Sequence, residues 1–337
     1  MATQYSGRIL VTGAAGLIGS AIVWQLNRLG LDDILISDRM DTSEKWKNLV
    51  PLRFSDYIHA DDLLNLVHNN PVKLAEIGTI YHLGACSATT ETDSDYLMRN
   101  NFEFTKELAI WAVATGKRFV YASSAATYGA REDGFSEELP LHTLRPLNMY
   151  GYSKHLFDQY AERHGLLQHI VGLKYFNVFG PNEDHKGDMR SVVHKAFHQI
   201  RETGKLELFQ SHRPDFEHGC QQRDFLYVKD AVRMTVFLAD TPAANGLFNL
   251  GAGTAQTWLE LGNAIFAAMG LKPNISFIPM PLHLRGKYQY RTCANIEKLR
   301  RVGYAEELTP LADAVKDYVQ NYLVPNLRLG DESLENV

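Results

Sequence analysis

Three residues in this chain stand out because their types and spacing could carry proton transfer. Tyr150 and Lys154, in the stretch MYGYSKHLFD, are four residues apart at the predicted start of a helix, so both side chains share one helical face. A tyrosine with a pKa of about 10 is a poor base at neutral pH, but a neighbouring positive charge favours its phenolate form. Lys186 lies in the polar cluster NEDHKGD, just after a predicted strand. Taken alone, the pair also fits an exposed helix turn, and the cluster also fits a solvated loop.

A glycine-rich turn near the start of the chain suggests a nucleotide. Gly13, Gly16 and Gly19 form the pattern G-x-x-G-x-x-G between a predicted strand and a predicted helix. Glycine permits the tight turn and lets backbone amides approach a pyrophosphate at the positive end of a helix. A plain glycine-rich turn is the alternative, but the first-strand position favours a dinucleotide.

The second predicted strand ends in residues that bear on which dinucleotide is bound. Asp38 is placed to accept the adenosine ribose hydroxyls, as acidic residues do in NAD sites. Arg39 beside it and Lys45 further on could instead hold a 2′-phosphate. Both NADP and NAD therefore stay open, and we favour NADP.

The elements that must position these residues alternate between short apolar runs and longer helical patterns, which is typical of βαβ units. Each predicted strand ends in small or polar residues, and the carboxyl ends of parallel strands share one edge, where ligands bind. We therefore expect an α/β fold with a Rossmann-type doubly wound parallel sheet. The predicted strands are 8–14, 33–38, 79–85, 118–124 and 170–180, and the predicted helices are 16–29, 61–69, 96–115 and 151–165.

The alternation breaks after Pro181. A helix is predicted at 190–202, followed by an irregular polar piece at 209–225. The stretch SFIPMP and predicted helices around 295–303 and 309–323 finish the chain. A strand–helix pair at 225–239 and a strand at 247–253 are expected to return to the first sheet. We predict a NAD(P)-binding domain of residues 1–180 plus about 225–255. A smaller, discontinuous α/β substrate-binding domain would comprise residues 181–224 and 256–330.

Composition limits the partners and the location. A net charge of −5 argues against nucleic-acid and anionic-membrane partners, which need a basic face. The three cysteines are widely spaced and make no disulfide framework. The N-terminus lacks a leader pattern and no apolar run reaches membrane length, so a cytoplasmic protein is expected. His194 and His198 are four residues apart, but without a third ligand at defined spacing we predict no metal site.

The motifs together resemble the extended short-chain dehydrogenases/reductases over essentially the whole chain. These motifs are the glycine-rich loop, a serine ending strand 118–124, and Y-x-x-x-K. More narrowly, five segments resemble the ADP-L-glycero-D-manno-heptose 6-epimerases, which make the heptose precursor of the lipopolysaccharide inner core. The segments are GACSATTETDSDYLMRNN (84–101), YASSAATYGAR (121–131), MYGYSKHLFD (149–158), YFNVFGPNEDHKGDM (175–189) and LRGKYQY (284–290).

The resemblance implies three sets of site residues. The catalytic set is Ser124, Tyr150, Lys154 and Lys186. The cofactor set is Gly13, Gly16, Leu17, Ile18, Gly19, Asp38, Arg39, Lys45, Leu83, Gly84, Ala85, Cys86, Ser87, Asn100, Tyr150, Lys154, Val178 and Lys186. The substrate set is Ser124, Asn177, Asp188, Lys195, Phe209, Gln210, Ser211, His212, Arg223 and Tyr288. Arg223 suits the diphosphate as a planar bidentate donor, and Cys86 is expected to pack against the dinucleotide.

The sequence departs from the family pattern at two of these positions and in one loop. Asp188 and Lys195 replace a serine and a histidine of relatives, and the 209–223 loop is longer than their compact version. The resemblance also implies a homo-oligomer, plausibly a pentamer.

The implied reaction explains why two acid/bases would be needed. The C–H of a heptose carbinol is far too weakly acidic for a side chain to remove, so the centre must be oxidised and reduced again. If the hydride returns to the opposite face, the oxygen points away from Tyr150, and Lys186 is our candidate for the second proton donor.

Two other kinds of protein remain as alternatives. A nucleotide-sugar 4-epimerase or dehydratase shares the fold. However, a 4-epimerase leaves Lys186 unexplained, and Ala125-Ala126 stand where 4,6-dehydratases carry acidic residues. A redox-sensing regulator that binds NADP without turnover often lacks the tyrosine or lysine of the pair, and this chain has both.

Overall fold

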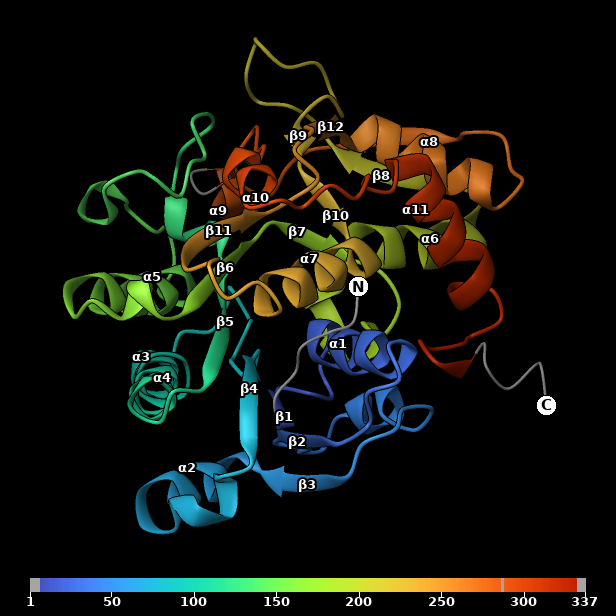
Figure 1. Cartoon of the computed structure of the whole chain (residues 1–337). Coiled ribbons are helices and arrows are strands. Elements are labelled where there is room, and N and C mark those ends of the chain that lie inside the picture. Colours follow the sequence, from blue (N-terminus) through green and yellow to red (C-terminus); the bar gives the residue numbers. More distant parts are fainter. Residues whose placement is uncertain (1–6, 286–287, 332–337) are drawn as a thin grey trace.

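A parallel sheet forms the centre of the molecule. The computed structural model describes residues 7–285 and 288–331, and within them seven parallel strands follow the order β11-β6-β5-β4-β1-β2-β3 (Figure 1). The strand order reverses between β1 and β4, and ligands bind in the crevice that opens at such a point. The strands are β1 (Arg8–Thr12), β2 (Ile34–Asp38), β3 (Asp56–His59), β4 (Ile77–His82), β5 (Arg118–Ser124), β6 (Val171–Tyr175) and β11 (Gly246–Leu250).

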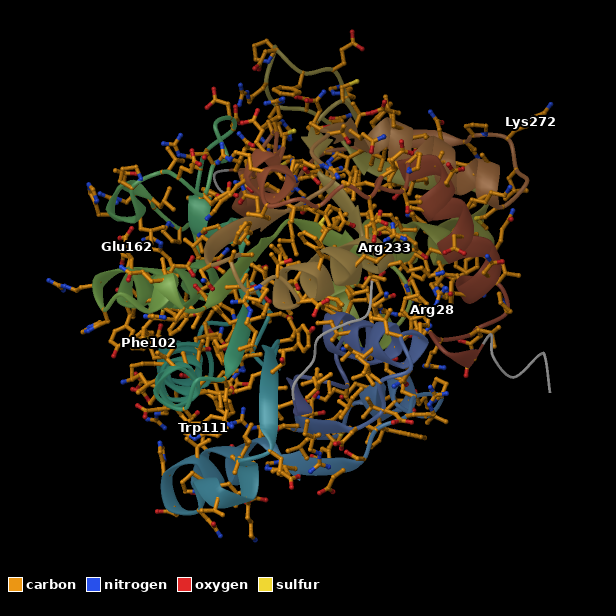
Figure 2. All side chains as sticks on the ribbon, viewed as in Figure 1. Arg28, Phe102, Trp111, Glu162, Arg233 and Lys272 are labelled. Carbon is orange, nitrogen blue, oxygen red and sulfur yellow. The ribbon has the colours of Figure 1, made fainter. Side chains whose placement is uncertain are left out.

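Helices cover both faces of this sheet. On one face α1 (Leu17–Arg28) packs against α7 (Val228–Ala239), and α2 (Ala60–Asn69), α4 (Phe104–Ala114) and α5 (Met149–Arg163) lie on the other (Figure 1). Figure 2 labels side chains of both layers, with Arg28 and Arg233 on the first and Trp111 on the second. Because both faces are covered, β2 and β6 are buried at every position, which gives the continuous apolar runs of a parallel sheet.

A smaller group of elements lies above one end of the sheet. The parallel pair of β8 and β13 adjoins α6 and α8, and α11 packs on α8. A capping box between Thr257 and Glu260 starts α8. The bounds of these elements are α6 (Val192–Thr203), β8 (Leu206–Phe209), β9 (Gln222–Arg223), β12 (Gln256–Thr257), α8 (Trp258–Ala268), β13 (Ile275–Ile278), α9 (Leu282–Arg285), α10 (Glu297–Arg301) and α11 (Leu311–Tyr318). The short helix α3 (Ser94–Leu97) lies instead beside α5. Of the 284–290 segment, residues 286–287 lie outside the described residues.

The structure corrects the predicted strand at 170–180. It is two strands, β6 in the main sheet and β7 (Asn177–Phe179), which pairs with β10 (Phe225–Tyr227). At the break, the Phe176 amide donates to Leu250 O (2.9 Å), and the Val178 amide turns back to Phe176 O (2.8 Å). The strand at 225–227 therefore does not return to the main sheet as predicted, whereas the predicted strand at 247–253 does, as β11 beside β6.

Two further elements differ from the predictions. The short edge strand β3 was not expected, because two of its four residues are exposed and its apolar pattern is weak. The predicted helix at 96–115 contains a π-helical turn, Met98–Glu103, between α3 and α4. Among the described residues, no helix has the length and apolar character needed to cross a membrane.

Candidate active site

A cavity of about 580 Å³ opens at the carboxyl edge of the sheet. A second cavity of about 210 Å³ adjoins it beyond the end of β2. The predicted residues that line the larger cavity are Gly13, Gly16, Leu17, Ile18, Gly19, Asp38, Lys45, Leu83, Gly84, Ala85, Cys86, Ser87, Ser124, Tyr150, Lys154, Asn177, Val178 and Lys186. Arg39 and Asn100 line the smaller one. The expected meeting of strand ends at one edge is thus confirmed.

The glycine loop has the shape of an anion cradle. Gly13 has φ +67°, and a Cβ there would lie 2.7 Å from the Gly84 amide nitrogen. A Cβ at Gly19 would lie 2.0 Å from Gly13 O, so both positions require glycine. Gly16, in contrast, meets only Gly13 O at 3.2 Å, and as N-cap of α1 it caps the helix with no side chain. The first-turn amides therefore face a ligand-sized space, which fits a pyrophosphate.

Asp38, at the end of β2, is bound by two backbone amides and one lysine. Its carboxylate accepts from the Ala15 amide (2.8 Å), the Arg39 amide (2.8 Å) and Lys45 Nζ (3.0 Å). The Arg39 guanidinium reaches Asn100 and Asp61. Ser43 also lines the cavity and was missed in the sequence analysis, although a hydroxyl between two basic residues is the kind of signal that marks a phosphate site.

Helix α5 brings the tyrosine and the lysine to the cavity. Asn148 caps it, accepting from the Gly151 amide at 2.8 Å. Burial raises the pKa of Tyr150, and a hydrogen bond with Ser124 opposes that rise. Burial also lowers the pKa of Lys154 to about 8, with the nearby Asp158 carboxylate acting against it. Lys154 therefore still carries its charge at neutral pH, where that charge favours the phenolate.

A buried ion pair lies beneath the predicted catalytic residues, and the sequence analysis missed it. Asp158 and Lys174 are both fully buried, with Lys174 Nζ 2.6 Å from the carboxylate. Ser123 and Tyr121 donate to the same carboxylate at 2.8 Å each, and Lys174 also donates to Thr127 (2.7 Å). The network joins β5, α5 and β6 directly behind Ser124 and Lys154. Its partners come from separate elements, so no local spacing announces it.

The cluster after β7 is divided between the cavity and the surface. His185, Lys186 and Met189 line the cavity. Burial lowers the pKa of Lys186 and lowers that of His185 to about 4, so His185 is neutral. Asp188 and Lys195 do not line it; both are exposed, and Lys195 Nζ donates to Asp188 O at 2.8 Å.

Most of the predicted substrate residues form a second group outside this cavity. The Arg223 guanidinium lies 4.9 Å from the Tyr288 ring and 5.6 Å from the Trp258 ring, and Trp258 Nε1 donates to the Tyr288 hydroxyl (2.8 Å). Asn177 lines the cavity and donates to Asp224 O at 3.0 Å, which links the cavity to the Arg223 backbone.

The loop that begins at the end of β8 lies beside this second group. The Gln210 amide donates to Ile278 O (2.8 Å), and Ser211 Oγ donates to the carbonyl of Arg213 (2.9 Å). The amide of His212 donates to the Tyr290 hydroxyl at 3.0 Å. Phe209 itself ends β8. The Tyr290 ring lies 5.4 Å from the Tyr288 ring, so the 209–212 loop lies near Tyr288.

Comparison with known proteins gives the family. Residues 9–251 match the model of the NAD dependent epimerase/dehydratase family. The chain belongs to this family. It is 50% identical over 315 residues to the ADP-L-glycero-D-manno-heptose-6-epimerase of Nitratidesulfovibrio vulgaris strain DP4, covering 93% of this chain and 97% of that protein. It is 44% identical over 326 residues to the protein of that name from Fusobacterium nucleatum, covering 94% and 98%. The crystal structure of the Helicobacter pylori ADP-L-glycero-D-manno-heptose-6-epimerase matches with a TM-score of 0.79 at 26% identity, over 94% of this chain and 96% of that chain.

Membership of the epimerase/dehydratase family confirms the predicted fold and an enzyme of the epimerase class. Its cofactor class is a nicotinamide dinucleotide. In this setting the Cys86 thiol lines the cavity with its pKa raised by burial, which disfavours the nucleophilic thiolate. His194 is buried and bound to Asp184 at 3.0 Å, its ring 4.7 Å from that of His198. The described residues contain no group of three or more possible metal ligands.

Proposed function

We propose that this epimerase inverts C6 of ADP-D-glycero-D-manno-heptose through transient oxidation to a ketone. The observation that carries the proposal is that Tyr150 and Lys186, two separate acid/base candidates, line one cavity together with a dinucleotide loop. The curated relatives named above support the substrate. A 4-epimerase needs one acid/base and gives Lys186 no task.

The cofactor we propose is NADP. The glycine loop and α1 N-terminus would hold the pyrophosphate, and Lys45, Arg39 and Ser43 would hold a 2′-phosphate. Lys45 supports this choice because its ammonium lies 3.0 Å from Asp38 and offsets the carboxylate charge that would otherwise repel a 2′-phosphate. Bound at this site, the nicotinamide would accept a hydride from the sugar and return it.

The proton transfers belong to the chain's own residues. Tyr150, as phenolate, would take the C6 hydroxyl proton while Ser124 holds the oxygen and Lys154 stabilises the negative charge. The resulting ketone is planar, so the sugar end can turn over before the hydride returns. With the oxygen now away from Tyr150, Lys186 would supply its proton. In the reverse direction the two residues exchange roles.

The group around Arg223 is proposed to hold the diphosphate. Arg223 is 8% exposed, and its guanidinium lies against two aromatic rings and donates to the Gln222 carbonyl, so its charge is available to an anion. Asn177, Asp188, Lys195, Phe209 to His212 and Tyr288 are proposed as further substrate contacts.

The setting of the enzyme is also a proposal. We propose the two-domain division given above, and it is supported by the separate β8–β13 pair. We further propose that the enzyme is a cytoplasmic homo-oligomer, a pentamer. Its product would supply the heptose of the lipopolysaccharide inner core. Sedimentation velocity would measure the number of copies.

The test is direct. The purified protein is incubated with ADP-D-glycero-D-manno-heptose without added cofactor, and the C6 epimers are separated by chromatography. Conversion is the expected result. If the heptose is unchanged even with added NADP while a UDP-hexose is epimerised, the enzyme is a 4-epimerase and the proposed substrate is wrong.

A further inference from the structure

Glu183 is a fully buried carboxylate close to the cavity, and the mechanism above does not use it. It accepts hydrogen bonds from the Ser191 amide (2.5 Å), the Ser191 hydroxyl (2.6 Å) and the Tyr318 hydroxyl (3.0 Å). These donors belong to the N-cap of α6 and the end of α11. All three are neutral, so the hydrogen bonds satisfy the oxygens without cancelling the charge.

Asn182, the residue before it, is held by hydrogen bonds to other parts of the chain. Its backbone has φ +77°, a left-handed conformation that costs energy for a residue other than glycine. Its side chain donates to Ser20 Oγ on α1 (2.9 Å) and accepts from the Leu329 amide (3.1 Å). Its carbonyl accepts from Asn48 (3.0 Å), which also binds Ala15 O in the glycine loop (2.9 Å).

The chain entering Lys186 is thus tied both to the glycine loop and to the C-terminal helix. The Lys186 amide itself donates to Glu183 O at 3.0 Å, which closes the turn. The contacts of Asn182 and Glu183 hold the start of this loop, and His185 and Lys186, which follow, line the cavity.

We propose that Glu183 is the positioning residue for Lys186: its buried carboxylate fastens the loop that carries Lys186 to Tyr318 and Ser191, and it places a negative charge three residues before that lysine. This inference rests on the proposed role of Lys186 as the second acid/base. It assigns a task to a carboxylate that lies outside the cavity and touches neither sugar nor cofactor.

The electrostatics around Lys186 agree with this assignment. Burial lowers the pKa of Lys186, and the Glu183 charge opposes that fall. Other titratable or charged groups around the loop are His185, which is neutral, Asp184, and Lys45 and Asp38 across the cavity. A neutral residue at 183 leaves all of these in place. It removes the Glu183 charge, which favours protonated Lys186, so the pKa of Lys186 should fall further.

The decisive experiment compares the pH profiles of Glu183→Gln and Tyr318→Phe. Glutamine keeps the shape but loses the charge, whereas phenylalanine removes one hydrogen bond and keeps the charge. In E183Q the limb of the kcat profile governed by Lys186 should move to lower pH by about one unit or more, in either reaction direction. At pH values above that limb, kcat in the direction that needs protonated Lys186 should fall about tenfold or more, with KM within about threefold. In Y318F the limb should not move.

Two further variants make the result unambiguous. Glu183→Asp draws the charge back by one methylene and should shift the same limb in the same direction by less. It decides the matter if E183Q does not fold, since an unmoved limb in a folded E183D overturns the proposal. An unmoved limb in folded E183Q overturns it as well. Lys186→Met tests the proposed function separately: if that variant epimerises at the parental rate, the two-base mechanism fails whatever Glu183 does.

Discussion

At Tyr150 two opposing influences meet. Burial raises the pKa of its hydroxyl, while the hydrogen bond with Ser124 opposes that rise. A positive charge on Lys154, one helical turn away, favours the phenolate on general electrostatic grounds. Tyr150, the proposed base, therefore depends on its neighbours. Lys154 depends in turn on Asp158, whose negative charge opposes the fall in the Lys154 pKa that burial causes. The pKa values of the acid/base candidates at this edge are therefore set by several neighbouring residues together.

The two acid/bases can be tested separately. Tyr150→Phe and Lys186→Met should each lower kcat for epimerisation by about 10³-fold, since general acid/base groups contribute factors of that order. Dinucleotide content and thermal unfolding should stay near the parental values, because neither change opens the cofactor loop. Chromatographic separation of the heptose epimers measures the rate. A loss below about threefold in either variant would move that role to another residue.

Lys45 carries the prediction on cofactor choice. Lys45→Met should weaken NADP binding by about tenfold or more and NAD binding far less, because only NADP has the 2′-phosphate. Fluorescence titration of the cofactor-free protein with each dinucleotide measures this. Lys47→Met is the matched control, since Lys47 pairs with Glu44 (2.5 Å) in the same segment but does not line the cavity. Equal losses for NADP and NAD would point to a general role of Lys45.

At the level of elements, the buried Asp158–Lys174 pair joins β5, α5 and β6. Lys174→Met leaves a buried carboxylate without its cation, so the free energy of unfolding should fall by about 3–5 kcal/mol. The double variant Asp158→Asn with Lys174→Met removes both charges and should recover much of that loss. Urea unfolding of the parental protein, Asp158→Asn, Lys174→Met and the double variant measures these free energies. If the double variant were as unstable as the sum of the single ones, hydrogen-bond geometry rather than charge would govern this junction.

Most strands of the main sheet could be predicted because periodicity and strand-end residues are local signals, whereas the edge strand β3 has too weak an apolar pattern. Gly13, Asp38 and Ser124 were placed correctly, since parallel strands bring their carboxyl ends to one edge whatever their loops do. The break at Phe176 could not be predicted, because an apolar run does not say which strand it will pair with. Likewise the contacts of Glu183 with Tyr318 and of Asp158 with Lys174 depend on elements brought together by folding.

At the scale of the whole molecule, the cofactor joins parts of the fold that are distant in sequence. The cavity takes residues from the glycine loop, α5 and the segment after β7, so a bound dinucleotide should stabilise all of them together. At about 100 times its dissociation constant, NADP should raise the free energy of unfolding by about 2.7 kcal/mol, seen as a higher melting temperature.

Gly19→Ala provides the comparison. Its Cβ would lie 2.0 Å from Gly13 O, so the glycine loop must move and the stabilisation by NADP should shrink. Differential scanning fluorimetry with and without NADP measures both proteins. An undiminished shift in G19A would mean that the dinucleotide does not bind against this loop.

The π-helical turn at Met98–Glu103 gives the helix after β4 one residue more per turn than an α-helix holds. Asn100 and Asn101 are both buried there, and Asn101 bonds the Cys86 backbone (2.8 Å) and Ser153 Oγ on α5 (3.0 Å). Removing one residue from this turn would give a more regular helix, yet it would rotate everything on one side of it by about 100° relative to the other. The extra residue in this turn therefore constrains insertions and deletions. Adding or removing a single residue here would separate Asn101 from Ser153 on α5, or turn Leu108 out of the core.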